Sequence, residues 1–140
     1  MLMKKILVPI ILIIFTGTYG YFAALPKPEG DGLAMAEISP ATHDFGEIEF
    51  GEIVTKEFTI VNNGETELEI RRVATSCACT TAEVDKRSIE PGGSAVLTVV
   101  YDSAAMGRSH ADGREERIVY IRTNDPAKPQ MEVTVYATII

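Results

Sequence analysis

The chain has 140 residues, 46% hydrophobic and 24% charged, which fits one soluble domain with a real core. It carries 20 Asp and Glu residues against 13 Lys and Arg; the first 28 residues hold three of the basic residues and none of the acidic ones, so the remainder has a net charge of 10 − 20 = −10. Because this charge repels phosphates and anionic headgroups, neither nucleic acid nor an anionic lipid surface is expected to bind the body of the protein.

The N-terminus has the composition of an export segment. A basic start, MLMKK, is followed by 20 residues without a charge, Ile6 to Leu25. A spanning helix needs about 20 apolar residues, whereas a cleaved signal peptide needs a shorter apolar stretch and small residues before its cleavage site. Cleavage after Gly20 would place the small residue Thr18 at position −3, which is acceptable for a signal peptide. The length of the apolar run nevertheless favours a transmembrane anchor. Either segment places the body outside the cytoplasm, in the periplasm or at the cell surface, with the two lysines of the start inside.

The stretch that follows, residues 26–40, reads as a linker because it contains three prolines and two glycines. We therefore expect a signal peptide or transmembrane anchor at 1–25, a linker at 26–40 and one folded domain at 41–140. A domain of about 100 residues has the size of an immunoglobulin-type sandwich.

The body shows the period of two that is typical of β-strands. Stretches rich in β-branched and aromatic residues alternate with turn signals such as NNG and PGG, and no stretch has the pattern of an amphipathic helix. Short strands separated in this way predict an all-β fold with two packed sheets. The last strand alternates to its end, which predicts Val133 and Val135 in the core. The expected strands are 53–61, 66–73, 94–102, 117–123 and 130–140.

The longest polar stretch, Ser103 to Glu116, separates two of these strands. It contains Gly107 and Gly113 and few apolar side chains. Loops of this length are usually mobile or functional, so we expect this one to protrude from the domain.

Two groups of motifs give a family resemblance. The stretch DFGEIEFGEIVTKEFTIVNNGETELEI, with Phe45-Gly46, Phe58 and Asn62-Asn63-Gly64 in this order, resembles the opening of Hydin-type and major-sperm-protein-like domains. The stretches SCACTTAEV, IEPGGSAVLTVVYD and RTNDPAKP resemble the bacterial exported family known as domain of unknown function 1573. In that family the cysteine segment usually has a glycine where this chain has Ala78.

The resemblance covers about residues 40–140 and implies an immunoglobulin-like β-sandwich of about seven strands outside the cytoplasm. It implies no activity, because the family has none assigned. Together with the export segment, the expected fold is this all-β sandwich preceded by an N-terminal apolar helix.

The two cysteines, Cys77 and Cys79, are the main chemical lead in the sequence. In an extended strand they would lie on one face about 6.6–7 Å apart, whereas a relaxed disulfide needs Cβ atoms about 3.8 Å apart. Since exposed thiols rarely survive in an oxidising compartment, they are either buried as small apolar side chains or joined across a bend. The small neighbours Ser76, Ala78 and Thr80 favour the bend. We expect the pair to be structural first.

Two other hypotheses make this pair a functional site. With Met106, His110 or His43, the two sulfurs would form a soft ligand set that suits Cu(I). A thiol–disulfide enzyme is the other alternative, although the chain lacks a C-x-x-C motif and a helix that would activate a thiol. The sequence assigns no residue as a metal ligand.

The sequence also lacks several common motifs of enzyme active sites. No G-x-S-x-G, H-E-x-x-H or phosphate-binding glycine loop occurs. We therefore expect no enzyme, no catalytic residue and no cofactor. The sequence favours a protein-binding or structural role with an unidentified protein partner, a membrane complex being one candidate, and contact with the membrane through the N-terminal helix.

Overall fold

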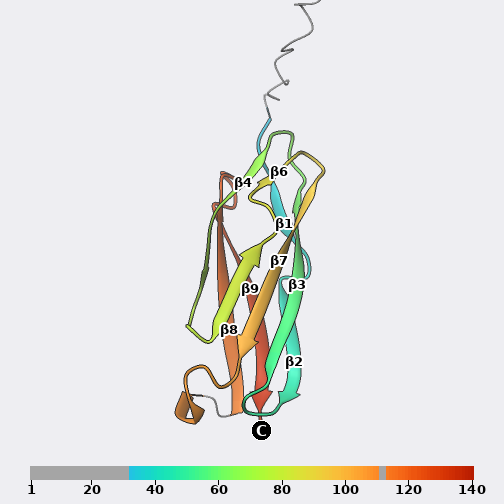
Figure 1. Ribbon diagram of the computed structural model, residues 1–140. Coiled ribbons are helices and arrows are strands. Elements are labelled where there is room, and N and C mark those ends of the chain that lie inside the picture. The colour runs from blue at the N-terminus through green and yellow to red at the C-terminus, as the bar shows by residue number, and fades with distance from the viewer. Residues whose placement is uncertain (1–31, 111–112) are drawn as a thin grey trace, which may run out of the picture.

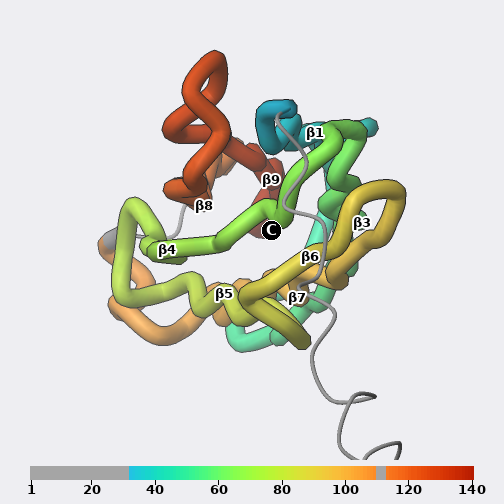
Figure 2. Tube along the Cα trace, turned by 90° about the horizontal axis from the view of Figure 1, so that it is seen from above, coloured from blue at the N-terminus to red at the C-terminus, as the bar shows by residue number. Residues whose placement is uncertain are grey.

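The described part of the chain forms nine strands in two sheets that pack face to face. The computed structural model describes residues 32–110 and 113–140, where the one helical segment is the 3₁₀ turn η1 (Arg108–His110). Figures 1 and 2 show an elongated body with its strands in two layers. The all-β prediction is confirmed. The strands are β1 (Ala36–Ile38), β2 (Thr42–Ile48), β3 (Ile53–Asn62), β4 (Leu68–Thr75), β5 (Thr80–Val84), β6 (Ser88–Ile89), β7 (Ser94–Asp102), β8 (Gly113–Thr123) and β9 (Gln130–Ile139).

The beginning of the chain contributes one strand to each sheet. One sheet has the strand order β1-β3-β7-β5 and the other has the order β2-β9-β8-β4-β6. Paired strands are antiparallel except β2, which runs parallel to β9. The first strand is divided at Ser39-Pro40, so that β1 joins one sheet and β2 the other. This division and the short β6 account for nine strands where about seven were expected.

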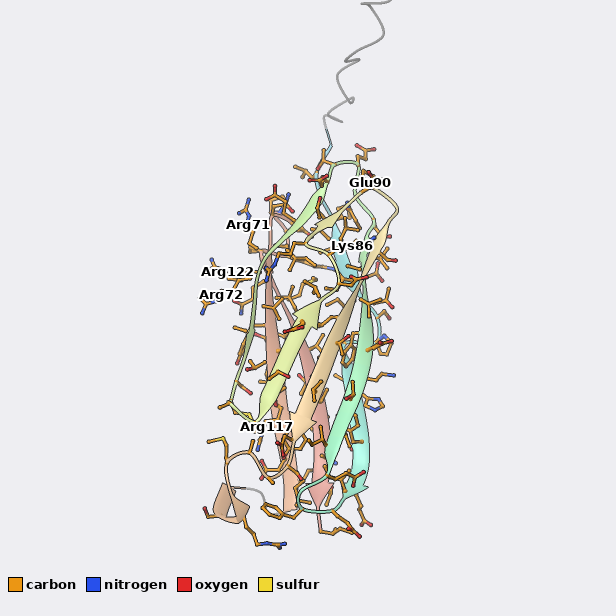
Figure 3. All side chains as sticks on the ribbon, viewed as in Figure 1. Arg71, Arg72, Lys86, Glu90, Arg117 and Arg122 are labelled. Carbon is orange, nitrogen blue, oxygen red and sulfur yellow. A yellow bond between two sulfur atoms is a disulfide. The ribbon has the colours of Figure 1, made fainter. Side chains whose placement is uncertain are left out.

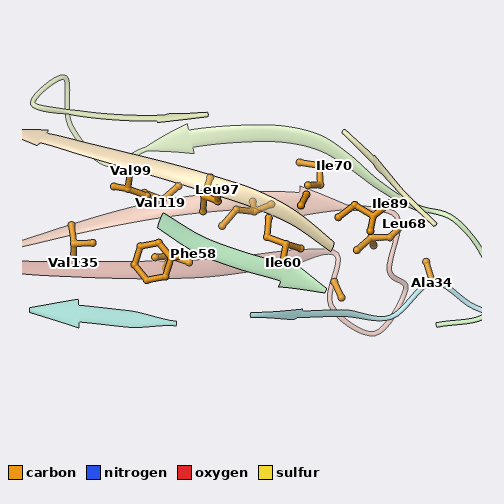
Figure 4. Close-up of a cluster of buried hydrophobic side chains, with 14 residues drawn as sticks. Ala34, Phe58, Ile60, Leu68, Ile70, Ile89, Leu97, Val99, Val119 and Val135 are labelled. Carbon is orange, nitrogen blue, oxygen red and sulfur yellow. The ribbon is translucent and has the colours of Figure 1, made fainter. Parts of the chain in front are cut away.

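The hydrophobic core lies between the sheets and follows the alternation of the strands. In β7, and in β9 from Val133 onward, every second residue is buried, as the pleat of a strand requires. Figure 4 shows the larger cluster, which includes Phe58, Ile60 and Leu97. Val133 and Val135 are buried, which confirms the inward face predicted for β9. A second cluster lies towards the ends of β7 and β9 and consists of Ile48, Cys79, Tyr101, Ala137 and Ile139.

The folded part begins earlier than the sequence indicated. β1 pairs with β3 although it lies inside the stretch 26–40 that was predicted as a linker. Ala34 and Ala36 are buried and belong to the main core cluster. Prolines and glycines marked this stretch as irregular, but its small alanines fit against the end of β3. The linker prediction was therefore too long at its C-terminal end.

A buried carboxylate holds β1 in place. Asp125, in the turn between β8 and β9, is 3% exposed and accepts a 2.8 Å hydrogen bond from the Ala36 N–H. The backbone N–H groups of Ala127 and Lys128 also donate to it. Burial pushes the pKa of Asp125 upward, but these three backbone hydrogen bonds, together with the nearby charge of Lys128, outweigh it and leave the pKa below its ordinary value. The charged form of Asp125 therefore ties the start of the domain to the opposite sheet.

The polar stretch Ser103 to Glu116 is a loop over only part of its length. β8 begins at Gly113, so residues 113–116 pair with β9 and do not protrude. At the other end Ser103 is buried, and its hydroxyl accepts a 2.8 Å hydrogen bond from the Gly51 N–H. The loop prediction was too long because local polarity does not report long-range pairing.

The predicted N-terminal helix, Ile6 to Leu25, lies outside the described residues. Across 32–110 and 113–140, no helix is long and apolar enough to cross a bilayer. Export and membrane anchoring stay predictions from the sequence.

Candidate functional site

Cys77 and Cys79 form a disulfide in the connection between β4 and β5. Their Cα atoms are 5.3 Å apart, closer than two residues on one face of an extended strand. The chain achieves this by turning: the Thr80 N–H points back to the Cys77 carbonyl at 3.4 Å. The cysteine segment is thus bent, and its two sulfurs lie side by side.

Hydrogen bonds tie this turn to both sheets independently of the sulfurs. The Ser76 N–H donates to the Ile118 carbonyl at 2.9 Å, and the Ser76 hydroxyl accepts from the Ile118 N–H at 3.0 Å. On the other side the Asp102 N–H donates to the Cys79 carbonyl at 2.9 Å. The first pair anchors the turn to β8 and the last bond anchors it to β7. The backbone of the turn is therefore held in place at both ends.

The two cysteines have unequal environments. Cys79 is 5% exposed and belongs to the second core cluster, where it packs with Tyr101 and Ile139. Cys77 is only partly buried at the edge of this cluster. The Thr80 hydroxyl lies 3.5 Å from the Cys77 sulfur and 3.8 Å from the Cys79 sulfur. The disulfide therefore has an outer sulfur and an inner one.

A guanidinium group lies against the inner sulfur. Arg117 Nε donates to Cys79 Sγ at 3.0 Å, while its Nη2 forms an ion pair with the Glu115 carboxylate. Its Nη1 donates to the Glu116 carbonyl at 2.8 Å, and its Cζ is 5.5 Å from the centre of the Tyr101 ring. The side chains of Arg117 and Glu115 are 16% and 17% exposed. Figure 3 shows Arg117 beside the lower part of the sandwich.

Burial raises the pKa of the Tyr101 phenol, and the neighbouring Arg117 offsets this effect only in part. Tyr101 therefore stays neutral at ordinary pH and packs against the guanidinium as an aromatic face. Of the groups that contact Arg117, only the Glu115 carboxylate carries a negative charge that balances the guanidinium beside Cys79.

Sequence reasoning missed Arg117 and Glu115 as members of this site. The signal was present, because residues 115 and 117 share a period-two face with the buried Val119 and Ile121 of β8. Two charged residues on an inward face need partners, and here they pair with each other and with the cysteine turn.

Within the described residues, no hydrogen bond joins His43 or Met106, two of the ligands considered for a copper site, to the cysteine sulfurs. His43 packs edge-on against Phe45, with ring centres 4.7 Å apart, and Met106 is an exposed residue of the turn after β7. Among the described residues no group of three or more His, Cys, Asp or Glu could hold a metal ion. The side chain of His110 lies outside the description. In the disulfide, moreover, neither sulfur is a thiolate ligand.

A second feature lies on the outer face of the five-stranded sheet. A β-bulge after Ile70 turns both Arg71 and Arg72 outward, and it sets Arg72 directly opposite Arg122 of β8. Figure 3 shows these arginines on one side of the body. Arg71 pairs with Glu69 at 3.6 Å, whereas the side chains of Arg72 and Arg122 have no hydrogen bond or ion pair within the described part of the chain. A hollow of ≈ 210 Å³ is lined by Arg72, Ala74, Tyr120, Arg122 and Gln130. We call these five residues the arginine face.

Comparison with known proteins supports the fold and gives the family. Residues 36–139 match the family model DUF1573, described as a protein of unknown function. The chain is similar to a solved structure of a protein of unknown function from Porphyromonas gingivalis W83, with a TM-score of 0.69 and 28% identity. This similarity covers 84% of the present chain and 51% of the other, so the chain spans about half the length of that relative.

Two less similar structures share the fold alone. The ASH/PapD-like domain 7 of human CEP192 has a TM-score of 0.56 at 14% identity, covering 85% of this chain and 95% of that domain. The VesB protease of Vibrio cholerae has a TM-score of 0.54 at 14% identity, covering 76% of this chain and 31% of the protease. No curated protein matches the sequence. The family model covers nearly all of the immunoglobulin-like sandwich, which confirms the resemblance seen in its motifs: the chain belongs to the DUF1573 family.

Proposed function

We propose that this chain is an extracytoplasmic, immunoglobulin-like binding module. It is attached to the membrane by its N-terminal segment and binds an acidic stretch of a protein partner on the arginine face. The observation that carries this proposal is the juxtaposition of Arg72 and Arg122, two exposed like charges directly opposite each other on neighbouring strands.

This juxtaposition is unfavourable for the isolated domain. Like charges that face each other across two strands destabilise a sheet, and the surrounding body has an acidic excess that offers many carboxylates as partners. Neither side chain uses one within the described residues. Residues that break a local rule without internal compensation are expected at functional sites. A ligand that supplies negative charge would remove the repulsion on binding.

The composition of the arginine face also suits a protein partner. Arginine and tyrosine are enriched at the energetic centres of protein interfaces, and Tyr120 lines the hollow together with the two arginines and Gln130. A guanidinium group binds a carboxylate through two parallel hydrogen bonds. Two such groups side by side therefore favour a peptide with closely spaced Asp or Glu residues.

Binding to the arginine face is tested with a hexaglutamate peptide, and hexalysine serves as the negative probe. Replacing both Arg72 and Arg122 with glutamine is expected to weaken binding of hexaglutamate at least about tenfold, because two charge-assisted contacts are lost. Titration calorimetry at low and moderate salt measures the affinity. The melting temperature should stay equal or rise slightly, since a repulsion is removed.

The matched control is Arg71→Gln, which removes one charge from the neighbouring position whose side chain already pairs with Glu69. It should leave the affinity within about twofold, the scale of an exposed ion pair. Equal binding by the wild type and the double variant would contradict the proposal. So would a failure of the wild type to bind the peptide.

Export is tested by topology. The basic start and the apolar run Ile6 to Leu25 support a body outside the cytoplasm, and a disulfide suits an oxidising compartment. A reporter enzyme that is active only in the periplasm, fused after Ile140, is expected to be active, and a reporter active only in the cytoplasm should be silent. A silent periplasmic reporter together with an active cytoplasmic reporter would contradict export.

A further inference from the structure

We propose that the Cys77–Cys79 disulfide is a thiol–disulfide exchange site that oxidises a pair of cysteine thiols on an extracytoplasmic polypeptide. In this site the sulfur of Cys77 is attacked, the sulfur of Cys79 leaves, and Arg117 holds the leaving thiolate. This chemistry is separate from binding at the arginine face, and each protein molecule accepts one electron pair.

The unequal burial of the two cysteines determines which sulfur is attacked. A thiolate must approach the disulfide from solvent, and Cys77 is the partly exposed member, whereas Cys79 is 5% exposed and packed in the second core cluster. Exchange rates depend on access and on which sulfur is attacked. Attack at Cys77 therefore makes Cys79 the leaving group.

Arg117 is placed to stabilise that leaving group. Its Nε lies 3.0 Å from Cys79 Sγ, and the rest of its guanidinium is fixed by Glu115, by the Glu116 carbonyl and by the face of Tyr101. A disulfide sulfur is a weak acceptor, so this contact gains strength only as negative charge develops on the sulfur. An interaction that strengthens along the reaction lowers its barrier, and it is most effective where water is excluded.

A purely structural reading explains less of this arrangement. The bridge joins residues two apart, and stabilisation by loop closure is smallest for the shortest loops. The turn is already fixed by backbone and hydroxyl hydrogen bonds from Ser76 and Asp102. A well-packed apolar contact at Cys79 would also need no partly buried ion pair next to it. Exchange chemistry, in contrast, accounts for the guanidinium beside the inner sulfur.

The reaction balances in two steps. First, a substrate thiolate attacks Cys77 Sγ; a substrate–Cys77 disulfide forms, the Cys77–Cys79 bond breaks, and the electron pair leaves on Cys79 as a thiolate beside Arg117. Second, the other substrate thiolate attacks the substrate sulfur of the mixed disulfide, and Cys77 leaves as a thiolate. The substrate dithiol is oxidised to a disulfide, and the protein disulfide is reduced to two thiols with protons from the substrate thiols.

A polypeptide substrate fits the place of this disulfide in the fold. β5 begins at Thr80, immediately after Cys79, and it is an edge strand whose one sheet neighbour is β7. An extended peptide can pair with the free edge of a strand through main-chain hydrogen bonds. Pairing along β5 would carry a substrate cysteine to the outer sulfur of Cys77.

The test uses the oxidised full chain with three probes: reduced glutathione, dithiothreitol and an extended peptide that carries two cysteines. Acid quenching followed by peptide mapping is expected to find the glutathione mixed disulfide on Cys77. Arg117→Gln should slow reduction of the disulfide by about tenfold or more, the size expected when a developing anion loses a charged donor. Arg117→Lys should recover part of the rate. The peptide should react about tenfold faster than dithiothreitol at equal thiolate concentration, since strand pairing raises its local concentration.

The matched control is Arg114→Gln on the same strand, where the arginine is exposed and pairs with Asp44 on the outer face; its rate should equal that of the wild type. A mixed disulfide found on Cys79, an unchanged rate in Arg117→Gln, or a disulfide inert to dithiothreitol in the folded protein would each overturn the proposal. The mapping uses wild-type protein, so it decides the question even where an Arg117 variant does not fold. Equal rates for the peptide and dithiothreitol would overturn the assignment of a polypeptide substrate.

Discussion

Replacing Val135 with aspartate is expected to unfold the domain. Val135 is 2% exposed in the middle of β9, where it belongs to the main core cluster between the sheets. A carboxylate at this position would be buried without a partner, which costs at least about 4 kcal/mol. A domain of this size is stable by only about 5–15 kcal/mol. Circular dichroism and urea titration should show the loss of the cooperative transition.

The neighbouring residue provides the control. Thr134 is opposite Ile118 and points to the outer face of the sheet, where it is partly exposed. Thr134→Asp introduces the same charge one residue away and should change the free energy of unfolding by about 1 kcal/mol or less. A folded, cooperative Val135→Asp variant would mean that the inward face of β9 is assigned wrongly.

The core could be read from the sequence because alternation and turn signals are local. Val133 and Val135 were expected inside on the pattern of one strand, and the structure buries both. The number of strands could not be read in this way. Where the first strand divides between two sheets, as at Ser39-Pro40, depends on partners far along the chain such as Asp125.

The candidate site was predictable only in part. The small residues around Cys77 and Cys79 indicated a bend, but the arginine at the inner sulfur comes from a strand 38 residues away from Cys79. The sequence also could not predict that Arg72 lies opposite Arg122, because a bulge in β4 sets the register of these two strands. Positions that depend on the register of distant strands need the fold before their chemistry can be seen.

β8 joins the two proposed sites in one strand. Arg117 and Arg122 are five residues apart, so the period of two places them on opposite faces. Arg117 faces inward to a carboxylate and a sulfur, whereas Arg122 faces outward to Arg72 and solvent. The two arginines can therefore be changed independently, and a variant at one should leave the other function intact.

A second large effect is expected at Asn62, the last residue of β3. Asn62 is fully buried, and its amide donates to the carbonyls of Thr66 and Ile89 at 2.8 and 2.9 Å. Its side-chain oxygen accepts from the N–H groups of Gly64 and Met35 at 2.9 and 3.4 Å. One side chain thus satisfies backbone groups from three separate segments. The sequence indicated only a turn here, since both asparagines of NNG look alike.

Asn62→Ala is expected to lower the free energy of unfolding by about 3–5 kcal/mol, because it leaves several buried backbone groups without partners and opens a cavity. Urea titration measures this loss. The control is Asn63→Ala at the exposed neighbouring position, where the side chain bonds only to the exposed Glu37 carboxylate and its loss should cost about 1 kcal/mol or less. Equal stabilities of the two variants would contradict the role of Asn62, since they differ chiefly in burial and in the backbone groups that each side chain satisfies.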